Sequence, residues 1–352
     1  MKTLSYIILL ASILFTYGCD ELNSDSADVS GTWLIPKDQI FDGGPGKDGI
    51  PALTNPQFAS VSATSYLKDN DLVLVMKIGS EIRIYPHPIL DWHEIINDEI
   101  NGTKFALTYC PLTGTGIAWN RVINGKETTF GVSGLLYNSN LIPYDRATNS
   151  NWSQMKLLSV NGSFIGTSPN LIPVIETSWL TAKQIFPSAK VVTTSTGYSR
   201  SYGTYPYGDY KTNNGLLLFP VSPEDSRLPR KERILGVLVN SEAKAYRFQD
   251  NGNNIDLISD IVGGKSITVI YSKSRNIITA YESVLEDGSI VTLTSVQNQL
   301  PIIMIDTDGN KYNLFGEVTE GPQQGKKLKS VTSMIAYWFA WGAFYPNTSI
   351  AN

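Results

Sequence analysis

Apolar runs and runs that alternate apolar with polar side chains recur along the chain and predict many short β-strands. Segment 72–78 is apolar and rich in β-branched residues, and segment 81–85 alternates charged and apolar side chains. Gly79 and Ser80 between them fit a tight hairpin turn. Similar patterns predict further strands at 105–109, 116–121, 128–132, 134–137, 216–219, 234–239, 243–248, 266–271, 277–283 and 290–294.

Helical patterns are fewer and short. Segment 178–186 predicts an amphipathic helix that ends at Pro187, and segment 92–99 predicts a helical turn with Asp91 as its N-cap. Segment 333–344 predicts a C-terminal helix with an aromatic face. The balance predicts a mainly β fold (a β-rich α+β fold), with a large antiparallel sheet or barrel-like core and a few short helices.

The first 30 residues predict export and lipid attachment. Lys2 precedes an apolar run at 4–15, and Gly18 stands directly before Cys19. This pattern predicts a lipoprotein signal peptide at 1–18 and acylation, such as palmitoylation, of Cys19. The alternative is an ordinary signal peptide or an uncleaved anchor, with Cys19 incidental. Polar, acidic residues then predict a flexible tether at 19–30. We therefore expect a membrane-anchored protein of the bacterial cell envelope, facing the periplasm or the cell exterior.

The composition of the remaining chain is that of a folded, acidic protein. A net charge of -4 and the lack of a strong Lys/Arg cluster disfavour nucleic-acid binding. Charged residues make up only 17% and aromatic residues 11%, which predicts a substantial core. No period of 20–50 residues is apparent, so no short-repeat architecture is expected. Residues 31–352 are expected to form a single β-rich domain.

Cys110 is the one thiol that remains after the predicted processing. If it is reactive, His93 is the natural base or hydrogen-bond partner, with Asp98, Glu94 or Asp145 to orient the imidazole. An activated thiol needs a lowered pKa, which usually requires a cationic or dipolar neighbour. The alternative is a buried structural cysteine. The turn that follows Cys110 also contains hydroxyl groups suited to stabilise a thiolate or an oxyanion, those of Thr113 and Thr115.

A polar stretch on an apolar frame follows at 130–154 and predicts a substrate pocket. Asp145 and Arg146 could instead form a structural ion pair. A tyrosine-rich stretch at 202–210 is either a ligand platform or an aromatic surface loop. The candidate substrate-binding residues are Ser133, Tyr137, Asn140 and Arg146, together with Thr113 and Thr115.

A metal site is the remaining chemical alternative. His87, His93 and Cys110 could offer two imidazoles and a thiolate, a set that suits copper or zinc. His87 lies between Pro86 and Pro88, which predicts an exposed turn, and carboxylates would have to complete the site. No residue pattern requires a cofactor.

Several motifs occur in an order that resembles the domain-of-unknown-function family 3179. The resemblance runs from about residue 31 to 350 and implies little about activity, although it favours redox chemistry at Cys110. Some members have a second cysteine two or three residues further on, where Thr113 and Gly114 stand here, which argues against a resolving-thiol mechanism. The motifs lie at 48–53, 85–86, 93–98, 108–115, 130–140, 144–146, 152–154, 205–210 and 338–341.

Three hypotheses follow from these observations. The first is a lipid-anchored, thiol-dependent enzyme, most plausibly an oxidoreductase, that uses Cys110 on a small-molecule substrate. Without a second cysteine, an oxidised Cys110 would need an external thiol to be reset. The second is a non-catalytic lipoprotein that binds a metal or a small ligand through His93 and Cys110. The third is a structural or interaction module of the cell envelope in which Cys110 is only packed.

Overall fold

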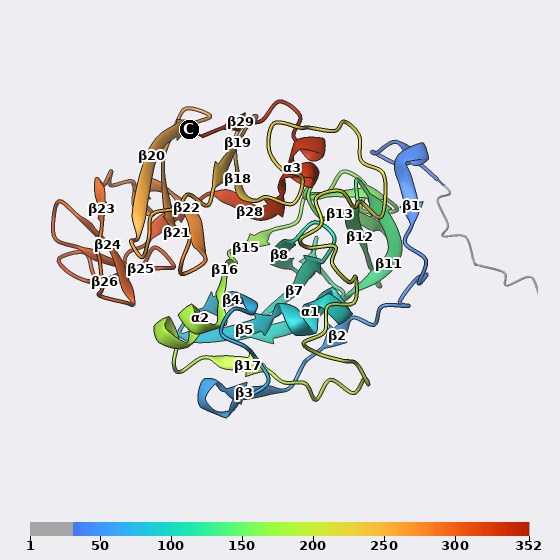
Figure 1. Ribbon diagram of the computed structural model, residues 1–352, viewed down its shortest axis with the longest axis horizontal. Helices are drawn as coiled ribbons and strands as arrows, with labels where there is room; N and C mark the ends of the chain where they lie inside the picture. The colour runs from blue at the N-terminus through green and yellow to red at the C-terminus, as the bar shows by residue number, and fades with distance from the viewer. Residues whose placement is uncertain (1–30, 352) are drawn as a thin grey trace, which may run out of the picture.

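Small open sheets, rather than one large sheet, build the molecule (Figure 1). The structure is a computed structural model that describes residues 31–351. The described strands form seven sheets of two to five strands, with three short α-helices between them. The predicted mainly β class is therefore confirmed, but the core is divided among these sheets and none of them closes into a barrel. The predicted signal peptide, Cys19 and the tether lie outside the described residues.

Two parts of the chain share one arrangement of strands. In each part, a two-stranded hairpin lies in the middle of the sheet, and one strand from later in the chain pairs with each side of it. The resulting orders are β16-β4-β5-β17 and β28-β18-β19-β29. The last strand is parallel to the hairpin in both, with Lys190 opposite Arg83 and Ser349 opposite Lys244. These strands are β4 (Leu72–Ile78), β5 (Glu81–Pro86), β16 (Ile175–Ser178), β17 (Lys190–Val192), β18 (Arg233–Val239), β19 (Glu242–Arg247), β28 (Thr332–Tyr337) and β29 (Ser349–Ile350).

A three-stranded antiparallel meander follows each hairpin. The order is β6-β7-β8 in the first half and β20-β21-β22 in the second. The turn after the middle strand has the same length in both, because Cys110 pairs with Thr115 and Ser272 pairs with Ile277. The strands are β6 (Ile95–Ile100), β7 (Thr103–Cys110), β8 (Thr115–Asn120), β20 (Asp256–Val262), β21 (Lys265–Ser272) and β22 (Ile277–Leu285).

The helices that connect the flanking strands repeat the same local structure. Helix α2 (Trp179–Ile185) follows β16 directly, and α3 (Trp338–Phe344) follows β28. Each begins with a buried tryptophan whose amide donates back to the residue before the hairpin, over 2.7 Å to Asp71 O and 2.8 Å to Glu232 O. The sequence contains an internal structural duplication, with a repeat far longer than the periods that sequence inspection excluded.

The two halves pack against each other reciprocally. Strand β28 of the second half packs on β8 of the first, and β16 of the first half packs on β22 of the second. These are equivalent pairs of strands, so the contact resembles the isologous interface of a two-fold dimer within one chain. The turn after each middle strand is thereby held by the other half, since Tyr337 N donates to Thr113 O and Thr181 Oγ1 donates to Arg275 O.

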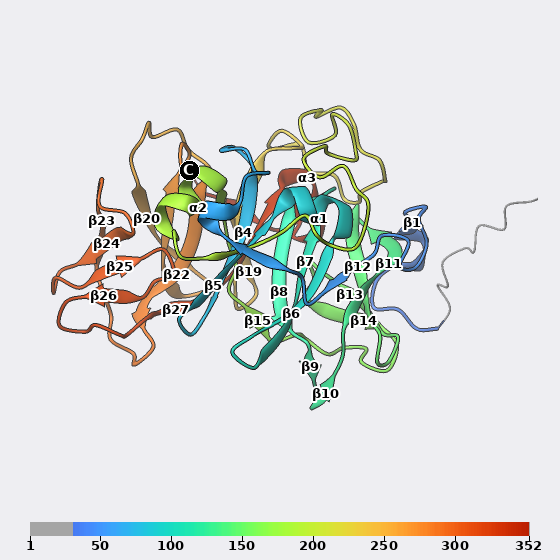
Figure 2. The same ribbon diagram turned by 90° about the horizontal axis from the view of Figure 1, so that it is seen from below.

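Further strands extend the repeated halves. The sheet β1-β11-β12-β13-β14 lies at the end of the molecule opposite the sheet β23-β24-β25-β26 in Figures 1 and 2. The remaining elements are η1 (Lys37–Gln39), β1 (Ile40–Asp42), β2 (Leu53–Thr54), β3 (Phe58–Ser60), η2 (Val61–Ala63), β9 (Val122–Ile123), β10 (Lys126–Glu127), β11 (Phe130–Tyr137), β12 (Asn140–Asp145), β13 (Asn151–Ser153), β14 (Leu158–Asn161), β15 (Leu171–Ile172), β23 (Leu293–Ser295), β24 (Ile302–Asp306), β25 (Lys311–Asn313), β26 (Val318–Glu320) and β27 (Leu328–Ser330).

The segment 193–232 joins the halves without a helix or strand. It runs over α1 (His87–His93) and close to α3, which is visible in both views (Figures 1 and 2). The predicted strand at 216–219 lies in this segment and is not formed. A connection of this length without secondary structure is uncommon in a compact fold and is often functional. It covers the region around Cys110, as described below.

Two of the predicted helices begin or end elsewhere. Helix α1 covers His87–His93, and the chain then enters β6, so the helical turn expected at 92–99 is wrong. Pro88 at the start of α1 favours an earlier beginning, and the pairing of β6 with β7 overrides the local helical signal. The residues at 333–337 are in β28 and only the aromatic part that follows is helical. No helix among the described residues is long and apolar enough to cross a membrane.

Candidate functional site

Cys110 ends β7 and is almost fully buried, with 1% of its surface exposed. Its carbonyl oxygen accepts from the amides of Thr113 (3.3 Å) and Gly114 (2.8 Å), which closes the turn. The Sγ atom lies 3.5 Å from Ser139 O, to which it can donate. Burial, helped by the nearby Glu94 carboxyl, raises the pKa of the thiol to about 11. In this conformation Cys110 is therefore a neutral thiol at physiological pH.

Glu94, and not the expected base His93, is the ionisable residue whose charge acts on the Cys110 thiol. It caps the C-terminal end of α1 with φ 55° and ψ -34°, and its carbonyl oxygen accepts from Tyr109 N over 2.6 Å. A left-handed, non-glycine backbone of this kind costs energy and is enriched at functional sites. Burial raises the pKa of its carboxyl to about 8, although Tyr207 Oη lies 3.4 Å from Oε1 and acts in the opposite direction. A carboxyl with this pKa can exchange a proton near neutral pH.

His93 makes its hydrogen bonds away from Cys110. Its Nδ1 lies 2.7 Å from Pro51 O and its Nε2 lies 2.6 Å from Tyr202 Oη. Because a carbonyl oxygen can only accept, Nδ1 carries the proton and Nε2 accepts from the tyrosine. Burial lowers the pKa of the imidazole, which keeps it neutral. The expected hydrogen bond between His93 and Cys110 is not formed.

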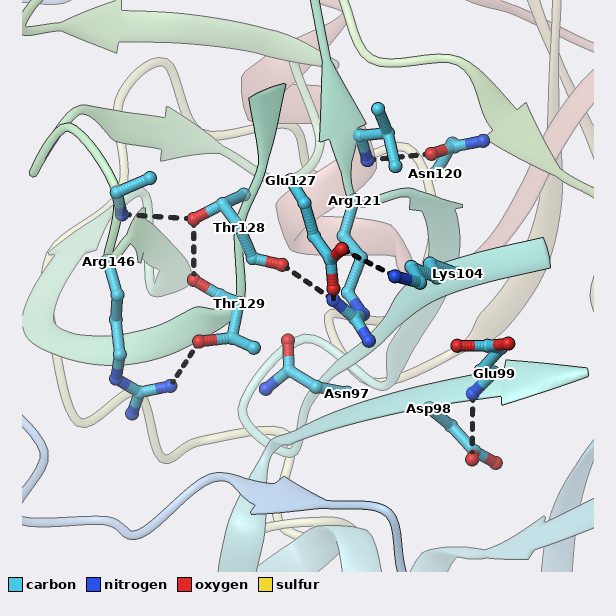
Figure 3. A network of polar contacts seen from close by, with 12 residues as sticks. Asn97, Asp98, Glu99, Lys104, Asn120, Arg121, Glu127, Thr128, Thr129 and Arg146 are labelled. Carbon is cyan, nitrogen blue, oxygen red and sulfur yellow. Dashed lines mark hydrogen bonds and ion pairs between the residues drawn. The ribbon is translucent and has the colours of Figure 1, made fainter. Parts of the chain in front are cut away.

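The carboxylates expected to orient His93 bind other groups. Asp98 accepts from Arg83 Nη1 and Tyr85 Oη, each over 2.7 Å, and Figure 3 shows its further bond to the Glu99 amide. Asp145 accepts from the amide and hydroxyl of Thr148 and from the indole of Trp152. Asp98 and Asp145 therefore stabilise strands and turns in the described structure.

The stretch 130–154 does meet the Cys110 turn, through a buried amide. Asn140 Nδ2 donates to Thr113 Oγ1 over 3.0 Å and to Gln154 Oε1 over 2.6 Å. Gln154 in turn donates to Thr115 O over 3.1 Å. The Thr115 hydroxyl itself lies 3.3 Å from Thr113 O. Of the expected pocket residues, Asn140, Thr113 and Thr115 therefore lie at the turn that follows Cys110.

The other residues that were expected to line a substrate pocket make contacts that hold the fold together. Ser133 Oγ donates to Ile142 O over 2.5 Å, which spans an irregularity in β11. Tyr137 packs edge to face on Phe344, with ring centroids 5.4 Å apart. Arg146 forms an ion pair with Asp48 over 2.7 Å. Figure 3 shows its further bond to the Thr129 hydroxyl. The alternative that paired Arg146 with the adjacent Asp145 is not realised.

The tyrosine-rich stretch covers the thiol and its neighbours. Tyr205 Oη donates to Pro111 O over 3.1 Å, and Lys211 Nζ lies 3.1 and 3.2 Å from the two Asp91 oxygens. Tyr207 reaches Glu94, and Tyr210 is fully buried. Sequence inspection noted the tyrosines without linking them to Cys110. The missing information was the path of the segment 193–232, which no local pattern specifies.

Buried ionisable groups continue from this cluster toward the second half. His87 stacks on Tyr109 with ring centroids 4.2 Å apart, and its Nε2 lies 3.1 Å from Glu176 Oε2. Burial would raise the pKa of Glu176, but Arg233 and His87 outweigh this effect and lower it. His87 is 3% exposed, so the exposed turn expected around it is wrong. The two prolines instead bracket the start of a buried helix.

A cavity of about 170 Å³ lies between the two halves. Equivalent strands contribute equivalent residues to its wall, Leu74 and Ala118 from the first half and Leu235 and Ala280 from the second. Glu176 is the acidic residue among those that line it. The cavity is large enough for a small organic group.

The described residues offer no ready metal centre. Within residues 31–351, no three or more His, Cys, Asp and Glu side chains are grouped so that they could hold a metal ion. His93 and Cys110 bind different partners, and His87 binds Glu176. The copper or zinc site considered from the sequence therefore has no geometric basis here.

The fold and the buried thiol–carboxyl cluster define a duplicated, mainly β protein with a covered polar centre. Comparison with known families assigns it: the model of the family "Protein of unknown function (DUF3179)" matches residues 47–348. The chain belongs to this family. No curated protein and no solved structure matches the chain.

Proposed function

We propose that the chain is a thiol-dependent enzyme that acts on a small molecule, with Cys110 as nucleophile and Glu94 as its proton acceptor. The observation that carries this proposal is the buried pair of Glu94 and Cys110 at a strained backbone position, beneath the segment 193–232. Strained backbone, shifted pKa values and an unusually long covering segment each favour a functional site.

The proposed step transfers a proton before a bond forms. Ionised Glu94, the minor form at neutral pH for a carboxyl with a pKa of about 8, takes the proton from Cys110, and the sulfur electron pair forms a bond to an electrophilic atom of the substrate. The bond from that atom to the leaving group breaks with its electron pair, and Glu94 returns the proton to the leaving group. With pKa values of about 11 and about 8, the proton transfer costs about 4 kcal/mol in the covered state. Water admitted beside the thiol would reduce this cost.

Access to Cys110 requires the segment 193–232 to open. Its contacts with the site include those of Tyr205 with Pro111, of Tyr207 with Glu94 and of Lys211 with Asp91. Because the segment contains no strand or helix, it lacks the ladder of backbone hydrogen bonds that holds the sheets beneath it and should open more readily than they do. The raised thiol pKa then describes the covered state, and the reactive state is the opened one.

The test is the denaturant dependence of Cys110 alkylation in the folded protein. We expect modification through local opening, at a rate that changes little with urea well below the unfolding transition. Tyr205→Ala and Tyr207→Ala should each accelerate the alkylation about tenfold. This is the effect of lowering the free energy that favours the closed segment by about 1.4 kcal/mol. Tyr198→Ala, at an exposed position in the same segment, is the matched control. A rate that follows only global unfolding in all variants would identify Cys110 as a structural cysteine and overturn the proposal.

A second candidate is a non-catalytic protein that binds a small ligand, and the neutral state of the covered thiol favours it. The cavity between the halves would then receive the ligand, with its apolar part against Leu74 and Leu235 and a donor group at Glu176. Substituting Leu235→Trp would fill this cavity. Loss of ligand binding in that variant, with binding retained in Cys110→Ser, would favour this candidate over the enzyme.

We further propose that the protein is held at the membrane of the bacterial cell envelope through a lipid on Cys19. The support is the apolar run followed by Gly18 and Cys19. Mass spectrometry of the N-terminal peptide should find an acylated Cys19. A Cys19→Ser protein that still sediments with membranes would contradict the proposal.

A further inference from the structure

The turn that joins β11 to β12 touches both the thiol and the segment that covers it. The pairing of the two strands leaves Asn138 and Ser139 as a two-residue turn, and both residues are buried. On one side, Ser139 O is the acceptor that lies 3.5 Å from Cys110 Sγ. On the other side, the turn bonds to the segment 193–232. It is therefore the one connection between them that runs through a single residue, Ser139.

Two hydrogen bonds fasten the covering segment to this turn. Ser139 Oγ donates to Phe219 O over 3.0 Å, and Ser222 N donates to Asn138 Oδ1 over 2.8 Å. These bonds involve residues of the segment that lie well after its tyrosine-rich stretch in the sequence. The segment is thus held beside the thiol at two separate places, and the second of them had no signal in the sequence pattern.

The backbone of the turn suits glycine better than serine at its second position. Asn138 has φ 49° and Ser139 has φ 60°. Two-residue hairpin turns with positive φ at both positions favour Asn followed by Gly, because a Cβ atom is strained in this conformation. The hydroxyl bond to Phe219 O is the contact that a glycine at position 139 would lack. The serine side chain therefore has a role beyond closing the hairpin.

This hairpin presents two groups with opposite effects to the sulfur. A carbonyl oxygen only accepts, so Ser139 O favours the S–H form of the thiol and opposes its ionisation. Burial and the Glu94 carboxyl raise the pKa of the thiol, whereas the Leu141 amide, together with Thr113, acts to lower it. A movement of the turn that withdraws the carbonyl and keeps the Leu141 amide in place therefore favours the thiolate.

We propose that Ser139 is a positioning residue that couples the closed or open state of the segment 193–232 to the ionisation of Cys110. While the segment is closed, the bond to Phe219 holds the Ser139 carbonyl against the thiol proton. When the segment opens, that bond breaks, the turn relaxes and the carbonyl leaves the sulfur. The inference rests on the enzyme proposed above, because it describes how the thiol becomes reactive only when the substrate can reach it.

The first test is the rate of Cys110 alkylation in the full chain with Ser139→Gly. Glycine adopts the left-handed backbone without strain, so the substitution removes the hydroxyl and leaves the turn. We expect the rate below the unfolding transition to rise about fivefold, the effect of one lost neutral hydrogen bond. Asn138→Gly, which removes the acceptor of the Ser222 amide, should act in the same direction. Urea unfolding should give nearly the same free energy of unfolding for Ser139→Gly and the unaltered protein.

Asn101→Gly is the matched control. Asn101 has φ 49° in the turn between β6 and β7, and its side chain bonds to Ile78 O in β4. The substitution therefore makes the same backbone change in a hairpin of the same half, and the alkylation rate should stay unchanged. A rise of equal size in Asn101→Gly and Ser139→Gly would show a general loosening of the fold and would overturn the inference.

The infrared S–H stretching band of Cys110 tests the link to the thiol itself. Subtraction of the Cys110→Ser spectrum isolates this band, and a carbonyl acceptor lowers its frequency. We expect the band to move to higher frequency in Ser139→Gly and to stay in place in Asn101→Gly. A contact that only holds the cover would leave the band unmoved in both, and that result would overturn the positioning role of Ser139.

The alkylation rates also separate this inference from the proposed enzyme. Acceleration by Tyr205→Ala without acceleration by Ser139→Gly or Asn138→Gly would overturn the coupling through the turn and leave the enzyme standing. Modification that follows only global unfolding in every variant, Tyr205→Ala included, would overturn the enzyme and the coupling together.

Discussion

Cys110 and Ser272 occupy equivalent positions in the two halves of the chain. Each is the last residue of the middle strand of a meander, each is buried, and each pairs across a turn of the same length. Their surroundings differ. Cys110 lies beneath α1 and the tyrosine-rich segment, whereas Ser272 precedes a turn whose Lys273 and Asn276 line an open pocket. The repeated scaffold therefore places the two turns in different surroundings.

This relationship predicts opposite effects of exchanging the two side chains. Ser272 Oγ is buried without a hydrogen-bond partner, so Ser272→Cys should leave the free energy of unfolding unchanged or raise it. Cys110→Ser places a smaller and more polar group at a fully buried position, where Ser139 O lies at 3.5 Å, and it should cost about 1 kcal/mol. Urea unfolding of both variants measures the effects. Equal destabilisation by the two substitutions would contradict this account of the equivalent positions.

The raised pKa of Glu94 predicts a stability that falls as the pH rises. The folded protein keeps this proton up to a pKa of about 8, whereas the unfolded chain releases it near the ordinary glutamate pKa of 4.5. The contribution is fully present below the unfolded pKa and is lost as the pH rises through the folded pKa. The full loss amounts to about 4 to 5 kcal/mol.

Glu94→Gln should remove this dependence, because an amide does not titrate. The free energy of unfolding, measured with urea at several pH values from mildly acidic to mildly basic, should fall less steeply in Glu94→Gln than in the unaltered protein. Glu99→Gln is the matched control, since this glutamate is exposed on the neighbouring strand. Parallel pH profiles of Glu94→Gln and the unaltered protein would show that the carboxyl does not carry a raised pKa.

Strand positions were predictable where packing follows the local pattern. The run at 72–78 coincides with β4, and the helix predicted at 178–186 is α2 with Ser178 as its N-cap. The error at 92–99 has a physical cause. The residues after Glu94 contribute to β6, whose pairing with β7 outweighs the local helical signal, and only the fold reveals that pairing.

Sequence reasoning selected residues of the Cys110 turn but not the partners of the thiol. Asn140 reaches this turn through Thr113, whereas the acidic neighbour of the thiol is Glu94 and His93 bonds elsewhere. Adjacent residues at a left-handed backbone position point in different directions, which sequence spacing cannot resolve. The duplication was equally hidden, because it is carried by hydrogen-bond register and a few residues such as Trp179 and Trp338.

Gly236 lies at a close contact between strand β18 and helix α3. A Cβ atom at this position in β18 would lie 2.1 Å from the Trp341 ring of α3, so either the helix or the strand would have to move. Overpacking of this kind typically costs about 1–3 kcal/mol, and we expect Gly236→Ala to reach the upper end. Gly215→Ala, in the segment 193–232, meets only the side chain of Asn213 and should be nearly neutral. Thermal unfolding compares the two; equal midpoints would refute the proposed close contact between β18 and α3.

The pKa of Cys110 distinguishes two hypotheses, that Glu94 or that His93 is the neighbour that sets it. The negative charge of Glu94 disfavours the thiolate, so Glu94→Gln should lower the pKa of Cys110, by about one unit. His93→Asn should leave that pKa nearly unchanged, because His93 is neutral and bonds to Pro51 and Tyr202. The ultraviolet absorbance of the thiolate, followed against pH in Cys110-containing protein and corrected with Cys110→Ser, measures both. A thiol pKa that rises in His93→Asn and stays fixed in Glu94→Gln would restore the thiol–imidazole pair and remove Glu94 from the proposed mechanism.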